Sequence, residues 1–189
     1  MSNPKYDDLN RARAALASFQ AHPPTRGHAG YRPTLEEPLT AKYDGVIGGY
    51  PRLEVLLQGG DGSIPYTRDG LARVDEMIRD RTFSDVEPET LALEIALYYG
   101  DVVLGAIPGA YWVIESGRFP RVQISEKHFV DMFLIAPVQI KAGQPFLCQA
   151  FDRIVQFGRR AAGRRSTRPA AQSLEQLICP PARTLPGVA

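Results

Sequence analysis

Residues 91–124 of this 189-residue chain read LALEIALYYGDVVLGAIPGAYWVIESGRFPRVQI, and this stretch decides the fold. Its first part is almost wholly apolar, which predicts a helix from Pro88 to Leu104 that is buried on most sides. Gly100 falls in the middle of that helix, where glycine costs about 1 kcal/mol relative to alanine, so we expect close backbone packing there. Ile107-Pro108-Gly109 ends the helix. The rest of the molecule should be built around it.

A polar stripe runs along this predicted helix at steps of three and four residues: Glu87, Thr90, Glu94, Tyr98 and Asp101. The favoured interpretation is the solvent-facing side of an amphipathic helix. The alternative is a pocket in which two carboxylates and a phenol could carry out acid–base chemistry. In that alternative the ligand-binding residues are Glu94, Tyr98, Asp101 and Trp112.

The residues after the helix predict a small sheet. Trp112 and Ile114 alternate with more polar neighbours, and Val122 and Ile124 do the same after a turn, which is typical of a hairpin packed on the helix. A hairpin alone is not stable, so a third strand is expected at about 127–130. Residues 131–143 fit either a strand or a short helix, and a helix is slightly favoured. A final helix is predicted from Pro145 to Gln156.

The first third of the chain predicts one helix followed by an arm. Pro4 to Gln20 has helical spacing and suitable first-turn acids. Residues 22–65 are rich in Pro, Gly and Tyr, and only Arg52–Leu57 resembles a strand, so we expect an extended arm lying along a surface. Another helix is predicted from Thr67 to Arg81. The fold class is therefore α+β: an antiparallel sheet of two to four strands packed against a central buried helix and a C-terminal helix, with an N-terminal helix and the arm.

Charge divides the chain into parts. The net charge is +1, but residues 61–158 sum to −5 and residues 159–189 to +5. This division predicts an N-terminal helix and arm at 1–65, a compact α+β domain at 66–158, and a basic, flexible tail at 159–189. No stretch has the apolar length of a membrane span, and two cysteines suggest thiols, so the cytoplasm is the expected location.

Residues 91–157 also resemble a known family. The matching segments are Tyr99-Gly100-Asp101-Val102-Val103, Pro108-Gly109-Ala110-Tyr111-Trp112, Pro120-Arg121-Val122, Asp131, and the Gly143–Phe151 start of the last helix. This pattern is similar to that of an uncharacterised family of small bacterial domains, found chiefly in actinobacteria. The resemblance implies an α+β fold and no particular activity. It does not explain the arm or the basic tail.

Few residues suggest catalysis or metal binding. His22, His28 and Cys179 fit no standard zinc spacing, and His128 has no nucleophile placed beside it by a recognisable motif. Gly59–Ser63 lacks the Lys-Ser/Thr of a phosphate-binding loop. We therefore assign no catalytic residue, no metal site and no cofactor.

Three functions remain from the sequence. The favoured one is a non-enzymatic interaction or assembly protein, whose arm and tail contact a protein partner or sister subunits, since body and tail carry complementary charge. The second is a small-molecule-binding domain or enzyme that uses the polar stripe and Trp112. The third is a nucleic-acid accessory protein that contacts phosphates through the tail arginines: Arg159, Arg160, Arg164, Arg165 and Arg168.

Overall fold

A computed structural model describes residues 4–21, 40–57, 64–83, 86–115, 118–133, 136–144 and 146–163. These residues form an α+β fold, as predicted, with a four-stranded antiparallel sheet. In chain order the elements are α1 (Pro4–Ala21), β1 (Thr40–Tyr43), α2 (Pro51–Leu57), α3 (Arg68–Asp80), α4 (Pro88–Ala106), β2 (Tyr111–Glu115), β3 (Arg121–Ser125), β4 (His128–Val130), α5 (Ala136–Ala142) and α6 (Leu147–Gly163).

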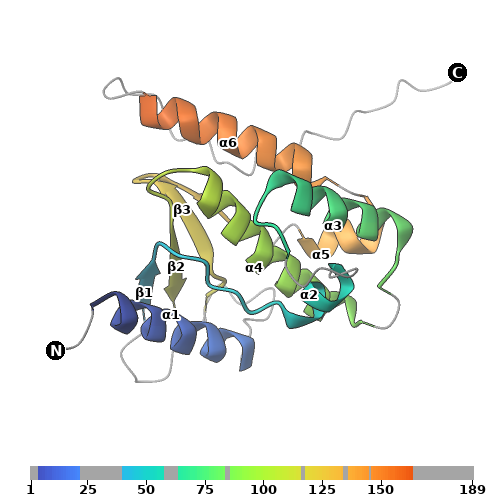
Figure 1. Cartoon of the computed structure of the whole chain (residues 1–189), viewed down its shortest axis with the longest axis horizontal. Helices are drawn as coiled ribbons and strands as arrows, with labels where there is room; N and C mark the ends of the chain where they lie inside the picture. Colours follow the sequence, from blue (N-terminus) through green and yellow to red (C-terminus); the bar gives the residue numbers. More distant parts are fainter. Residues whose placement is uncertain are drawn as a thin grey trace, which may run out of the picture.

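The central helix is α4, and its prediction is confirmed. In Figure 1, α6 runs along the upper edge of the molecule and α1 along the lower edge, while α4 crosses the space between them. Most of its side chains are buried, which explains the nearly continuous apolar sequence. A Cβ on Gly100 would overlap the ring of Trp112, so the absence of a side chain lets β2 approach the helix. The glycine is therefore a packing requirement.

The sheet has the strand order β1-β2-β3-β4. The predicted hairpin and third strand are confirmed, and the side chains predicted to face the helix are buried: Trp112, Ile114, Val122 and Ile124. The fourth strand, β1, comes from the predicted arm. It pairs antiparallel with β2, with Thr40 opposite Glu115 and Tyr43 opposite Trp112.

Residues 40–57 pack on the rest of the molecule. Ala41, Ile47, Tyr50 and Leu53 are all buried in the same core as α4. The strand predicted at Arg52–Leu57 is wrong, because Pro51–Leu57 forms the helix α2. Proline at its first position favours a helix start, and Leu53 alone is fully buried from this short helix. The short apolar run did not distinguish between the two structures.

The C-terminal part largely follows prediction. Residues 136–142 form a helix, the favoured alternative, and α6 continues past Gln156 to Gly163. Asp75 joins α3 to α6, because its Oδ1 accepts hydrogen bonds from the N–H groups of Phe146 and Leu147 at 2.9 and 2.8 Å. Its Oδ2 accepts from the N–H of Cys148 at 3.0 Å. A carboxylate from another helix thus satisfies the free N–H groups at the start of α6.

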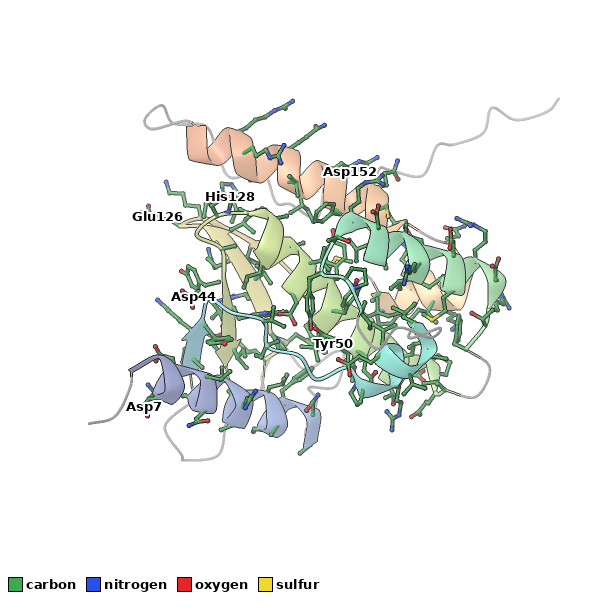
Figure 2. The ribbon with its side chains drawn as sticks, in the orientation of Figure 1. Asp7, Asp44, Tyr50, Glu126, His128 and Asp152 are labelled. Carbon is green, nitrogen blue, oxygen red and sulfur yellow. The ribbon has the colours of Figure 1, made fainter. Side chains whose placement is uncertain are left out.

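A second link between α3 and α6 is at the surface. Arg68 donates from its guanidinium to both carboxylate oxygens of Asp152 at 2.9 Å. Figure 2 labels Asp152 on α6. This bidentate hydrogen bonding holds the pKa of Asp152 below its usual value. Together with Asp75, the pair fixes the orientation of α6 across α3.

Candidate functional site

Asp101 is a carboxylate that accepts four hydrogen bonds. It is fully buried on α4. Its Oδ1 accepts hydrogen bonds from the N–H of Ile47 at 3.0 Å and from the indole Nε1–H of Trp112 at 2.8 Å. Its Oδ2 accepts from the N–H of Gly48 and from the hydroxyl of Tyr50, both at 3.0 Å. One side chain therefore joins α4, β2 and the segment that follows β1.

The electrostatics of Asp101 reflect two opposing effects. Burial away from water raises the pKa of this carboxyl, while the four donated hydrogen bonds act in the opposite direction. The adjacent Tyr50 hydroxyl is also buried, and burial raises its pKa far above the usual value. Figure 2 shows Tyr50 in the middle of the molecule, beside α4. Because each oxygen of Asp101 already accepts two hydrogen bonds from the chain itself, this carboxylate serves the fold.

Glu94 has a similar structural role two turns earlier on α4. Its Oε2 accepts a hydrogen bond from the N–H of Leu53 at 2.8 Å, at the start of α2. Its Oε1 lies 3.8 Å from a guanidinium nitrogen of Arg52, whose side chain is more than half exposed. Burial raises the pKa of Glu94, although these contacts oppose the change. Glu94 and Asp101 together attach residues 47–53 to α4.

Tyr98 completes this side of the helix. Its hydroxyl donates a hydrogen bond to the carbonyl of Pro65 at 2.6 Å, and its ring meets that of Tyr50 edge to face. Burial raises the pKa of the phenol well above the usual value. The solvent-facing interpretation of the stripe is therefore wrong for Glu94, Tyr98 and Asp101, which are all buried. The chain covers the stripe with its own residues 47–53 and Pro65.

The structure brings the four predicted ligand-binding residues to one side of α4. Asp101 and Trp112 are in direct contact, and Glu94 and Tyr98 lie on preceding turns. Their described hydrogen bonds are made to the chain itself. A ligand role for this set stays a prediction, and an open pocket lies elsewhere.

That pocket is a groove between the end of α3, the start of α4 and the exposed side of α5. Its volume is about 720 Å³, within the range of about 300–1,000 Å³ typical of ligand sites. We call it the α4–α5 groove. Its lining side chains, predominantly apolar, are Arg81, Phe83, Pro88, Glu89, Leu93, Phe119, Phe133, Pro137, Val138, Ile140 and Lys141.

The floor of the groove continues into the aromatic core. Phe119 and Phe133 stack with ring centroids 5.5 Å apart, and Phe19 of α1 meets both rings edge to face. Phe133 is fully buried, whereas Val138 on the rim is 54% exposed. The floor is therefore well packed, and the apolar surface extends outward along α5.

Charged side chains lie at the rim of the groove. Arg81 follows the last turn of α3, and Lys141 lies in the last turn of α5. Glu89 lies in the first turn of α4, where the helix dipole stabilises a negative charge. Among the described residues, none of these three side chains forms an ion pair. Sequence reasoning missed this site because its lining comes from four separate segments.

The predicted basic contact residues are only partly described. Arg159 and Arg160 lie exposed on α6, which extends into the region predicted as the tail. Arg164, Arg165 and Arg168 lie outside the described residues. Partner or nucleic-acid contact by these arginines stays a prediction.

Two other residues considered for chemistry have ordinary environments. The Nδ1 of His128 lies 2.8 Å from the hydroxyl of Ser125, with which it forms a hydrogen bond. The imidazole ring of His128 meets the ring of Phe157 of α6 edge to face. Burial raises the pKa of the Cys148 thiol to about 11, so the unreactive protonated form predominates near neutral pH. His22, His28 and Cys179 lie outside the described residues.

The described part of the chain lacks two kinds of feature. No cluster of three or more His, Cys, Asp or Glu side chains there is arranged to hold a metal ion. None of the helices there combines the length and apolar character needed to cross a membrane.

Comparison with known proteins does not place the chain in a family. No protein-family model, curated protein or solved structure matches it. The resemblance of residues 91–157 to the actinobacterial domains therefore stays a prediction, and function must be argued from the groove itself.

Proposed function

We propose that this protein is a non-enzymatic interaction protein that binds an apolar segment of a protein partner in the α4–α5 groove. The observation that supports the proposal is an apolar groove of about 720 Å³ that lies open beside α5. Exposed apolar surface next to a well-packed floor is a common feature of protein-binding sites. The proposal keeps the function favoured by the sequence and moves the contact surface from the arm and tail to the body.

The shape of the groove supports a macromolecular partner over a small ligand. Small-molecule sites enclose most of the ligand, about 70–90% of its surface. Here the rim residue Val138 is 54% exposed and continues the apolar surface beyond the floor. A partner segment that inserts one or two apolar side chains and covers Val138 would bury both the floor and the exposed rim of the groove.

A display experiment tests the proposal. A random twelve-residue peptide library would be selected on the wild-type protein and then tested on Val138→Glu, which places a charge on the rim. The matched control is Val55→Glu on α2, where the parent valine is 74% exposed and does not line the groove. We expect the selected peptides to bind wild type and Val55→Glu and to lose binding to Val138→Glu.

Two results would contradict the proposal. One is a selection that yields no peptide sensitive to Val138→Glu. The other is a set of peptides that bind all three proteins equally, which would assign their binding to another surface. Circular dichroism of both variants would show that the charge has not disrupted the fold.

A further inference from the structure

We infer that the α4–α5 groove selects partner segments in which a carboxylate lies beside the apolar side chains, with Arg81 as the specificity-determining residue and Lys141 as a second cation. The inference rests on the proposed function, and it names the chemistry of the partner. It is carried by the backbone conformation of Arg81, the position of its guanidinium, and the charges around the groove.

The backbone of Arg81 is in a conformation that disfavours a side chain. Its φ of 53° and ψ of 37° place it in the left-handed region, and it is the single non-glycine residue with positive φ among those described. Glycine is the usual residue where a helix ends in this way, because a Cβ is unfavourable there. The cap needs only the backbone N–H of residue 81, which donates to the carbonyl of Met77. The α3 cap itself therefore does not require a side chain at residue 81, and residues held in such conformations occur often at functional sites.

The guanidinium of Arg81 lies across the C-terminal end of α5. A Cβ on Gly143 would lie 3.3 Å from one of its terminal nitrogens and 3.4 Å from Nε. Gly143 itself has a φ of 64°, so glycine here both permits the turn and leaves room for the guanidinium. The negative end of the α5 dipole favours a cation in this place. Arg81 is thus held beside the groove while its side chain makes no hydrogen bond or ion pair in the described structure.

The described residues of the rim carry more positive than negative charges. Lys141 lines the same groove and is also without an ion-pair partner in the described residues. Among the described lining residues Glu89 is the single acid, and it lies at the start of α4, where the helix dipole stabilises it. Neither cation pairs with it. A ligand that brings a carboxylate would therefore meet donors that are already in place.

The groove chemistry points to a carboxylate within a peptide. The planar guanidinium matches the two oxygens of a carboxylate, and such charge-assisted hydrogen bonds are stronger than neutral ones. The floor is apolar and aromatic, so the acid must come with apolar side chains that fill the space below it. An acidic-apolar peptide segment supplies both.

The peptides that bind wild type and lose binding to Val138→Glu provide the test. Those that contain Asp or Glu would be synthesised with Asn or Gln in their place, and dissociation constants would be measured by fluorescence anisotropy. We expect the neutral peptide to bind wild type about tenfold more weakly than the acidic one. The two peptides should bind equally to a protein carrying both Arg81→Gly and Lys141→Gln. Arg79→Gln, on the last turn of α3 and outside the groove lining, is the control for loss of one positive charge.

The possible failures separate the two proposals. If groove-dependent peptides show no preference for the acid, the inference is wrong while the proposed function stands. If no peptide depends on the groove, both are wrong. Thermal unfolding of Arg81→Gly provides a second readout, since we expect an unchanged or higher Tm. A Tm lowered by several degrees would assign Arg81 a structural role and overturn its assignment as the specificity-determining residue.

Discussion

Asp101 and Arg81 are both ionisable residues close to α4, and their surroundings are opposite. Asp101 is fully buried and accepts four hydrogen bonds from its own chain. Arg81 is exposed in a left-handed backbone conformation, and its guanidinium forms no ion pair with the described residues. In the sequence, Asp101 resembles an active-site residue because it belongs to the polar stripe on α4. Arg81 belongs to no recognisable motif.

The difference shows which charged side chains are available to a partner. A buried carboxylate must be satisfied internally, because an unpaired buried charge costs several kcal/mol. An unpaired cation at an open apolar rim costs little free energy, since water solvates it. Polar residues on a central helix can therefore serve the fold, while less conspicuous residues at its periphery are the better candidates for binding.

The largest predicted effect is on stability and comes from removing the buried carboxylate of Asp101. Asp101→Ala would leave the N–H groups of Ile47 and Gly48, the Tyr50 hydroxyl and the Trp112 indole without their acceptor. We expect the free energy of unfolding to fall by about 3–5 kcal/mol, measured by urea denaturation. The control Asp80→Ala, at an exposed site, should change it by less than about 0.5 kcal/mol. A loss below about 1 kcal/mol for Asp101→Ala would show that the segment does not depend on this carboxylate.

A second pair of variants tests how closely β2 approaches α4. Gly100→Ala should cost about 1–3 kcal/mol, because the new methyl group would overlap the Trp112 ring. Gly105→Ala, on the same helix, has its nearest neighbour 4.0 Å from the new Cβ. It should increase stability by up to about 1 kcal/mol through helix propensity. Equal effects of the two substitutions in chemical denaturation would contradict the packing described here.

A smaller predicted effect is the pH dependence of stability that Asp101 causes. Burial raises its pKa in the folded state above the value of 3.8 expected when unfolded, so the folded state binds a proton more readily. That contribution to stability is fully present below the unfolded pKa and is lost as the pH rises through the folded pKa. We therefore expect wild type to gain stability relative to Asp101→Asn as the pH falls from 7 toward 4.5. Denaturation curves over that range would check this. A trend of opposite sign would mean that the four hydrogen bonds outweigh burial.

The smallest predicted effect concerns the open side. Arg81→Gly should raise the free energy of unfolding by up to about 1 kcal/mol, since glycine relieves the strain of the left-handed conformation. The gain is limited because glycine also increases the conformational entropy of the unfolded chain. Thr82→Gly is the control, because Thr82 does not have positive φ. It should be neutral or destabilising in the same thermal and chemical unfolding measurements. A clear loss of stability in Arg81→Gly would remove the conformational part of our argument.

The elements that were predictable from sequence are those defined by local pattern. The long apolar run gave α4, alternation gave β2 and β3, and Gly100 indicated close packing. β1 was missed because it has only four residues and its partner strand lies in another third of the chain. The strand predicted at Arg52–Leu57 was wrong because a six-residue segment with four apolar residues fits both periodicities.

The sites were less predictable than the fold. The polar stripe on α4 was visible, but the N–H groups that satisfy Asp101 come from Ile47 and Gly48, in a segment without a recognisable pattern. The groove collects side chains from the residues that follow α3, from α4 and α5, and from the loop residues Phe119 and Phe133. Nothing in local spacing indicates that Arg81 and Lys141 line the same space. Such convergence is a property of tertiary structure.

The sheet order also has a consequence for the timing of folding. β2, β3 and β4 are consecutive in sequence, so they can pair as soon as they are synthesised. β1 must wait for β2, and Ile47 lies 54 residues before the carboxylate that it contacts. Closing such long loops is slow relative to forming local contacts. Tyr50 and Leu53 therefore stay exposed on a growing chain until α4 has formed, and this interval is when a protease or another unfinished chain has access to them.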